Sequence, residues 1–221
     1  MKLLLTSGGI SNRSIEQALI DLLGKPIEES SALSIPTGIY PFSSGPEYGW
    51  KFAAGKAASR MVDLPWKSMG LLEPSVLPSI DKDVWQGVVR AADAILVFGG
   101  ATLFLHYWFT QSGLADFFNE LPDTVYVGWS AGSMVMTPSI GEEFIEWWPP
   151  SHKDEALGIV PFSIFPHMDV PWSKENSMAH AEIWAAKMPN TSYAIDDDTA
   201  IKVVDGEVEV ISEGNWVLFN G

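Results

Sequence analysis

Val125-Tyr126-Val127-Gly128-Trp129-Ser130-Ala131-Gly132-Ser133 is the stretch that decides the fold of this chain. Its first residues are β-branched and aromatic, which is typical of a buried strand. It then passes into Gly-x-Ser-x-Gly, and the residues after this motif suit the start of a helix. Two glycines around one serine permit a sharp turn from strand to helix, and such a turn lifts the serine hydroxyl off the strand. The pattern therefore predicts a nucleophile elbow at Ser130.

A second junction of the same kind precedes the elbow. The continuous apolar run 94–98 is expected of a central parallel strand, and Gly99-Gly100-Ala101-Thr102 follows it directly. A helix is predicted over 102–119, with an interruption near Gly113. The carboxyl ends of parallel strands lie at one edge of a sheet. Backbone N–H groups from both junctions can therefore meet at Ser130 and stabilise an oxyanion, although a plain tight turn at the two glycines is an equal alternative.

The rest of the sequence extends this pattern in both directions. We expect strands at 2–6, 31–36, 69–72 and 157–165, helices at 14–23, 50–62, 81–92 and 173–187, and a loop over 37–49. Four short strands are expected near the end of the chain, at 193–195, 200–204, 207–211 and 216–219, with a hairpin signal at Asp205-Gly206. The sequence thus predicts an α/β fold in one domain, residues 1–221. A mostly parallel sheet is flanked by helices, with a small antiparallel C-terminal addition.

The composition narrows the class of protein. The chain has 221 residues, and 28 acidic against 13 basic residues give a formal charge of −15, which disfavours binding to nucleic acid or to an anionic membrane surface. There is no cysteine, so disulfides, thiolate metal sites and a cysteine nucleophile are excluded. The apolar start at Met1 is too short for a signal peptide, and no apolar run reaches the length of a membrane span. We expect a cytoplasmic monomer or homodimer with no metal or other cofactor.

A serine hydroxyl needs a base within hydrogen-bond reach, and the base needs an orienting partner. The chain offers four histidines: His106, His152, His167 and His180. His167 is favoured because it follows a proline at the carboxyl end of an apolar segment, and active sites of open α/β sheets gather at that edge. Several acidic residues are candidates for the orienting partner, and their order in the chain does not choose between them: Glu142, Glu143, Glu146 and Asp169.

Taken together, four segments resemble peptidase E: the elbow at 128–133, the turn at 98–102, the run 157–167 that ends in Pro-His, and the end of the chain from 205 to 216. This is the aspartyl dipeptidase family of serine peptidases, related to cyanophycinases and to class I glutamine amidotransferase folds. The resemblance runs in order along the chain, and the interval of 37 residues from Ser130 to His167 (167 − 130) fits the family. It implies an exopeptidase that removes an amino-terminal aspartate from short peptides without a metal.

The resemblance also implies roles for individual residues. Ser130 is the expected nucleophile and His167 the expected general base. The N–H of Ala131 and that of Gly99 or Gly100, with Gly100 preferred, form the expected oxyanion hole.

Two departures from the family pattern bear on the site. The family's aspartate falls near Ile145 here, and this side chain cannot orient a histidine. The run 138–142 is similar to branches with a Ser-His-Glu triad, so we expect Glu142 to be the acid, ahead of Glu146 and Glu143. The second departure is a missing arginine. The family places one in the helix after the histidine to pair with the substrate carboxylate, whereas residues 176–182 contain none.

His180 is the only residue in that segment that can become cationic, so the preference for aspartate stays open. The family's Gly-Gly-Asn-Thr turn is also altered, with Ala101 in place of the asparagine. Two other functions remain as alternatives. One is a binding or regulatory protein whose triad has decayed, and the other is an amidase or esterase for small substrates with Trp147 and Trp148 lining its pocket.

Overall fold

A seven-stranded sheet in the order β3-β2-β4-β5-β1-β8-β9 forms the centre of the computed structural model, which describes residues 1–58 and 60–221. Five strands are parallel, and β8 and β9 continue the sheet in the antiparallel direction. The strands are β1 (Lys2–Thr6), β2 (Ser31–Ile35), β3 (Ser68–Leu71), β4 (Ala94–Val97), β5 (Val125–Trp129), β8 (Thr199–Val204) and β9 (Glu207–Ser212). The predicted α/β fold with a mostly parallel sheet is confirmed.

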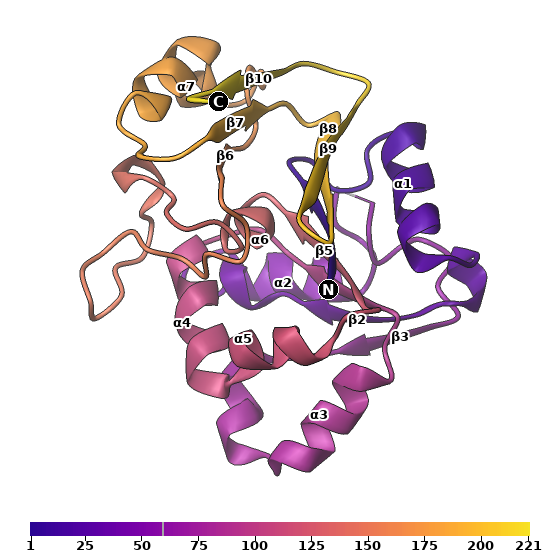
Figure 1. Cartoon of the computed structure of the whole chain (residues 1–221). Coiled ribbons are helices and arrows are strands. Elements are labelled where there is room, and N and C mark those ends of the chain that lie inside the picture. Colours follow the sequence, from indigo (N-terminus) through magenta and orange to yellow (C-terminus); the bar gives the residue numbers. More distant parts are fainter. Residues whose placement is uncertain (59) are drawn as a thin grey trace.

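Helices cover both faces of this sheet (Figure 1). Leu4 of β1 packs in one apolar cluster with α1 (Arg13–Leu23) and α2 (Gly45–Ala53). Its neighbours Leu3 and Leu5 face the other cluster, which includes residues of α3 (Lys82–Arg90), α4 (Thr102–Ser112) and α5 (Leu114–Phe117). Because both faces are buried, the central strands are continuously apolar rather than alternating.

A smaller mixed sheet corrects the prediction of a simple antiparallel addition (Figure 1). It consists of β6 (Ser163–Phe165), β7 (Ser192–Ile195) and β10 (Trp216–Phe219). β7 is antiparallel to β10 but parallel to β6, because the chain returns between β6 and β7 through α7 (Met178–Ala185). The predicted strand 157–165 is therefore confined to β6, while β8 and β9 belong to the main sheet.

Two helices begin several residues away from the predicted position, for local reasons. The helix predicted over 50–62 is α2, which begins inside the predicted loop at Gly45 with a proline in its first turn, and the chain turns at Gly55 (φ 65°). Residue 59 of that predicted helix lies outside the described residues. The helix predicted from 173 begins at Met178, because Ser177 caps it. Asp205 and Gly206 both have positive φ, as the predicted hairpin between β8 and β9 requires.

The short helical elements complete the description: α6 (Ala131–Met134), η1 (Ile27–Glu29), η2 (Thr37–Ile39), η3 (Pro74–Ser79), η4 (Phe118–Glu120), η5 (Glu142–Phe144) and η6 (Lys174–Asn176). No helix among the described residues is long and apolar enough to cross a membrane.

Candidate active site

Ser130 lies between β5 and α6 with φ 53° and ψ −114°, a conformation that residues other than glycine rarely adopt. The end of β1 holds this turn. The carbonyl oxygen of Thr6 accepts hydrogen bonds from the Ser130 N–H (3.0 Å) and from the Ser133 hydroxyl (2.7 Å). The strand, the strained serine and the short helix together form the nucleophile elbow that the sequence predicted.

The two glycines of the motif are required by close packing. A Cβ atom on Gly128 would lie 2.5 Å from the carbonyl oxygen of Gly132, and one on Gly132 would lie 2.3 Å from the carbonyl oxygen of Val97 in β4. The buried Tyr126 hydroxyl donates a 2.6 Å hydrogen bond to the same Gly132 carbonyl. β4, β5 and α6 thus approach more closely than any side chain would allow, and this fixes the position of Ser130.

The Gly99-Gly100 loop lies beside the elbow because β4 and β5 are parallel neighbours. A Cβ atom on Gly99 would touch the Ser130 Cβ at 3.4 Å, and Gly100 has φ 126° and packs against the carbonyl of Gly38. The N–H groups of Gly100 and Ala131 donate no hydrogen bond to another residue in the described part of the chain. Both residues line the pocket that contains Ser130, so these donors are available to a ligand at the hydroxyl.

His167 follows β6 and lines the same pocket as Ser130, so the structure brings the predicted nucleophile and base together. Its side chain is only 14% exposed, and its Nδ1 lies 2.6 Å from the Asp197 Oδ1. No hydrogen bond joins the Ser130 hydroxyl to the His167 ring within residues 1–58 and 60–221. Such contacts often form only when substrate is bound.

Asp197, rather than the expected Glu142, is the carboxylate at His167. β6 and β7 are parallel, with Phe165 opposite Ala194, so His167 and Asp197 leave neighbouring strands at the same edge. Glu142 is exposed in η5 and lines a different hollow, and among the described residues neither Glu143 nor Glu146 forms a hydrogen bond or ion pair with the His167 ring. The expectation of Glu142 comes from the likeness of the run 138–142 to branches with a Ser-His-Glu triad, and the parallel pairing of β6 and β7, which brings Asp197 to His167, is not part of the predicted fold. The available signal was the acidic run 196–198 directly after an apolar strand.

Ser7 links His167 to Asp197, although the sequence did not indicate a role for it in the site. Its hydroxyl donates to Asp197 Oδ1 (2.9 Å) and accepts a hydrogen bond from the His167 backbone N–H (2.7 Å). Burial raises the pKa of the Asp197 carboxyl, but the hydrogen bond and charge of His167 and the hydrogen bond of Ser7 outweigh it. The net result is a pKa below the usual range, so Asp197 is held as the anion facing the ring.

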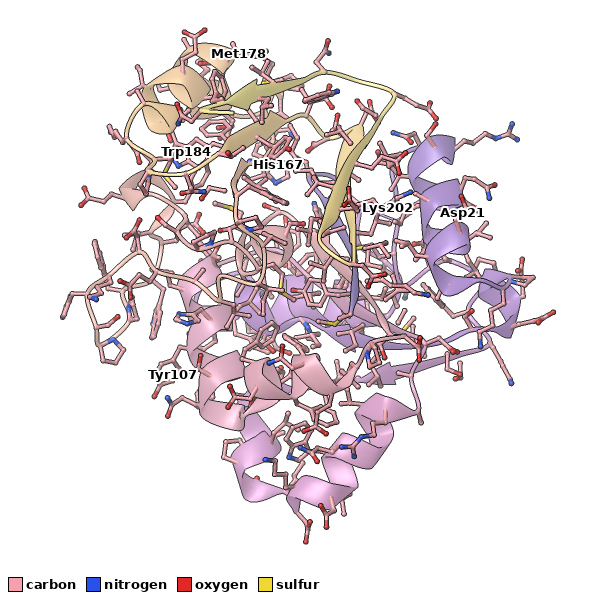
Figure 2. All side chains as sticks on the ribbon, in the orientation of Figure 1. Asp21, Tyr107, His167, Met178, Trp184 and Lys202 are labelled. Atoms are coloured by element: carbon pink, nitrogen blue, oxygen red, sulfur yellow. The ribbon has the colours of Figure 1, made fainter. Side chains whose placement is uncertain are left out.

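The pocket around Ser130 has a volume of about 1000 Å³ and is lined by residues from separate segments of the chain, between Ile39 and Trp184. In Figure 2, His167 and Trp184 of α7 lie in the upper part of the molecule, away from Tyr107 on α4. Trp172 is 66% exposed and packs edge-on to the His167 ring, with centroids 5.0 Å apart. Trp147 and Trp148 do not line this pocket, since Trp147 packs against α4 instead. No group of three or more His, Cys, Asp or Glu side chains suited to a metal ion occurs in the described residues.

A serine at a strained strand-to-helix turn, free N–H groups beside it and a His–Asp pair in the same pocket define a serine hydrolase site on an α/β sheet. Residues 3–211 match the sequence profile of peptidase family S51, so the chain belongs to this family, whose members are serine-type peptidases. No curated protein sequence matches the chain.

Two solved structures share the fold. One is described as a candidate peptidase E protein from Listeria monocytogenes EGD-e, with a TM-score of 0.67 and 18% identity, covering 96% of this chain and 98% of the other. The second is a peptidase from an acI-B1 Actinobacterium, with a TM-score of 0.72 and 19% identity, covering 99% of this chain and 90% of the other. Both likenesses concern the fold, and they agree with the family resemblance noted in the sequence.

Proposed function

We propose that this protein is a serine exopeptidase that hydrolyses short peptides from their amino-terminal end with Ser130, His167 and Asp197. The single observation that carries the proposal is one pocket that contains the strained Ser130 and the His167 ring, with Asp197 at the ring's Nδ1. Membership of peptidase family S51 supports a peptide substrate. Asp197 takes the role that the sequence suggested for Glu142.

The geometry supports a conventional acyl-transfer mechanism. Asp197 keeps the proton on Nδ1 of His167, which leaves Nε2 free to accept the Ser130 proton as the hydroxyl attacks the peptide carbonyl. The N–H groups of Gly100 and Ala131 donate to the oxyanion of the tetrahedral intermediate. His167 then protonates the leaving amine, and a water molecule activated by the same ring hydrolyses the acyl-enzyme.

Two alternatives have weaker support. The decayed-triad hypothesis was motivated by the absence of a suitable acid and of the family's arginine, and Asp197 removes the first of these reasons. The amidase or esterase hypothesis used Trp147 and Trp148 as pocket walls, and neither side chain lines the pocket.

The test is a comparison of wild type with Ser130→Ala. The wild-type protein should be labelled by a fluorophosphonate probe at Ser130 and should release the first residue from a dipeptide panel. Ser130→Ala should abolish labelling and lower turnover by about 10³-fold or more, as removal of a triad serine does. Equal peptide hydrolysis by the two proteins would overturn the proposal, and cleavage of simple esters without any dipeptide would favour the esterase alternative.

A further inference from the structure

The charges that line the catalytic pocket are almost all negative. Three glutamates contribute to the lining, Glu143, Glu146 and Glu175, whereas no lysine or arginine does among the described residues. Among the described residues that line the pocket, only His167 and His180 have side chains that can become cationic. This negative charge is unexpected, because the resemblance of the chain to peptidase E implies a substrate with an acidic first residue.

Not all three carboxylates are equally available. Glu143 forms an ion pair with Lys187, which lies outside the pocket lining, so its charge is already compensated. Glu146 and Glu175 form no ion pair or side-chain hydrogen bond with another residue in the described part of the chain. Two uncompensated carboxylates thus face the space in which a substrate must lie.

The consequence for binding follows from simple electrostatics. A substrate carboxylate placed in this pocket meets like charges, while a substrate ammonium or guanidinium meets opposite ones. The formal charge of −15 on the whole chain acts in the same direction, because it attracts cationic peptides and repels anionic ones. Although Glu146 is exposed as a whole residue, partial desolvation of its carboxyl raises the pKa, and a bound cation would lower it again.

The apolar part of the lining suits a long cationic side chain. Trp172 stands at the catalytic histidine with 66% of its surface exposed, and Tyr48 and Ile183 are also exposed at the pocket. Lysine and arginine bury their methylene stems on such surfaces, and their charged ends interact favourably with aromatic faces.

We propose that the pocket selects peptides whose first residue is lysine or arginine, with Glu146 and Glu175 binding the α-ammonium group and the side-chain cation. The inference rests on the proposed function for turnover, but its binding part can be tested without turnover. Two positive charges on the substrate residue match the two uncompensated carboxylates.

The first test measures kcat/KM for Lys-Leu, Arg-Leu, Leu-Leu and Asp-Leu at low ionic strength. We expect Lys-Leu and Arg-Leu to exceed Leu-Leu about tenfold and Asp-Leu by more, with the preference shrinking as salt is added. Of Glu146→Gln and Glu175→Gln, the one that removes the partner of the side-chain cation should lower the values for Lys-Leu and Arg-Leu about two- to fivefold and change Leu-Leu little. The other, which removes the partner of the α-ammonium group, should lower the values for all four peptides by a similar factor. Glu182→Gln is the matched control, because this exposed glutamate of α7 does not line the pocket.

The second test measures binding of the same peptides to Ser130→Ala by isothermal titration calorimetry. Tighter binding of Lys-Leu and Arg-Leu than of Leu-Leu supports the inference even if the wild type cleaves none of them, in which case only the proposed function fails. A preference for Asp-Leu or Leu-Leu in either measurement overturns the inference while leaving peptidase activity intact. Failure of Lys-Leu and Arg-Leu to bind also overturns it. So does selection of Asp-Leu that increases at low pH and disappears in His180→Ala.

Discussion

Replacing Asp197 by asparagine tests the assignment of the catalytic acid most directly. The substitution keeps the size and shape of the side chain but removes its charge. Asp197 Oδ1 accepts hydrogen bonds from His167 Nδ1 at 2.6 Å and from the Ser7 hydroxyl at 2.9 Å. In the variant, Ser7 should still donate to the amide oxygen. This hydrogen bond from Ser7 keeps the amide oxygen of the asparagine, rather than its NH₂ group, directed at the His167 ring.

The size of the effect follows from this geometry. With the oxygen retained, the tautomer of His167 is preserved, and the loss comes from the missing charge opposite the imidazolium of the transition state. Two unit charges at 2.6 Å interact by roughly 6 kcal/mol at an effective dielectric constant of about 20. The Asp197 side chain is 38% exposed, so solvent screening reduces this to about 3 kcal/mol, or a fall in kcat of about 10²-fold.

Adding Ser7→Ala to the Asp197→Asn variant should reveal a second effect, the loss of the correct tautomer of His167. Without the Ser7 donor the amide can turn its NH₂ group toward Nδ1 and stabilise the wrong tautomer, which in such triads costs about 10⁴-fold in total. Ser7→Ala alone should cost about tenfold or less, since the carboxylate keeps its contact with the ring. The double variant should therefore lose more than the product of the single losses.

Two assays measure this series: dipeptide turnover and the rate of fluorophosphonate labelling at Ser130, which does not depend on the peptide chosen. Thermal unfolding of each variant checks that the fold is retained. Glu142→Gln is the comparison, because Glu142 lines a separate hollow, and it should change neither rate more than about twofold. A large loss in Glu142→Gln with an unchanged Asp197→Asn would refute the reasoning.

Three further predictions concern the elbow and the contribution of Asp197 to stability. Tyr126→Phe should lower the free energy of unfolding by about 1–3 kcal/mol in urea titrations, because the buried Gly132 carbonyl loses its 2.6 Å donor. Gly132→Ala should abolish labelling of Ser130, because the new Cβ would lie 2.3 Å from the Val97 oxygen; unchanged labelling would contradict the packing argument. The pKa of Asp197 is lowered in the folded protein, so its stabilising contribution is complete above the usual aspartate pKa of about 3.9 and is lost as pH falls through the lower folded value. The stability difference between wild type and Asp197→Asn should shrink correspondingly below about pH 4, as measured by urea titrations at several pH values.

The elements that sequence predicted well depend on short-range patterns. The apolar runs of β1, β4 and β5 follow from burial on both faces of a sheet, and the Gly-x-Ser-x-Gly motif can be read within a few residues of Ser130, although the contact that requires Gly132 is with Val97 of β4. His167 was found in the same way, because its place after an apolar segment could be read from neighbouring residues. The predicted helix ends were less accurate. α2 begins at Gly45 and α7 begins after Ser177, and residues of these types mark a helix end only when the backbone around them has the required geometry.

The carboxylate at the His167 ring could not be predicted from any short segment of the sequence. Asp197 reaches His167 because β6 and β7 pair in parallel across the intervening α7, and Ser7 joins them because β1 ends beside the same turn. Strand pairing is a long-range choice, and the residues of β7 alone are compatible with either direction. The sequence alone therefore determined the fold class and indicated Ser130 and His167 as candidate site residues. Only the tertiary structure decided which carboxylate lies at the His167 ring and which charges line the pocket, because those contacts depend on how distant strands are placed side by side.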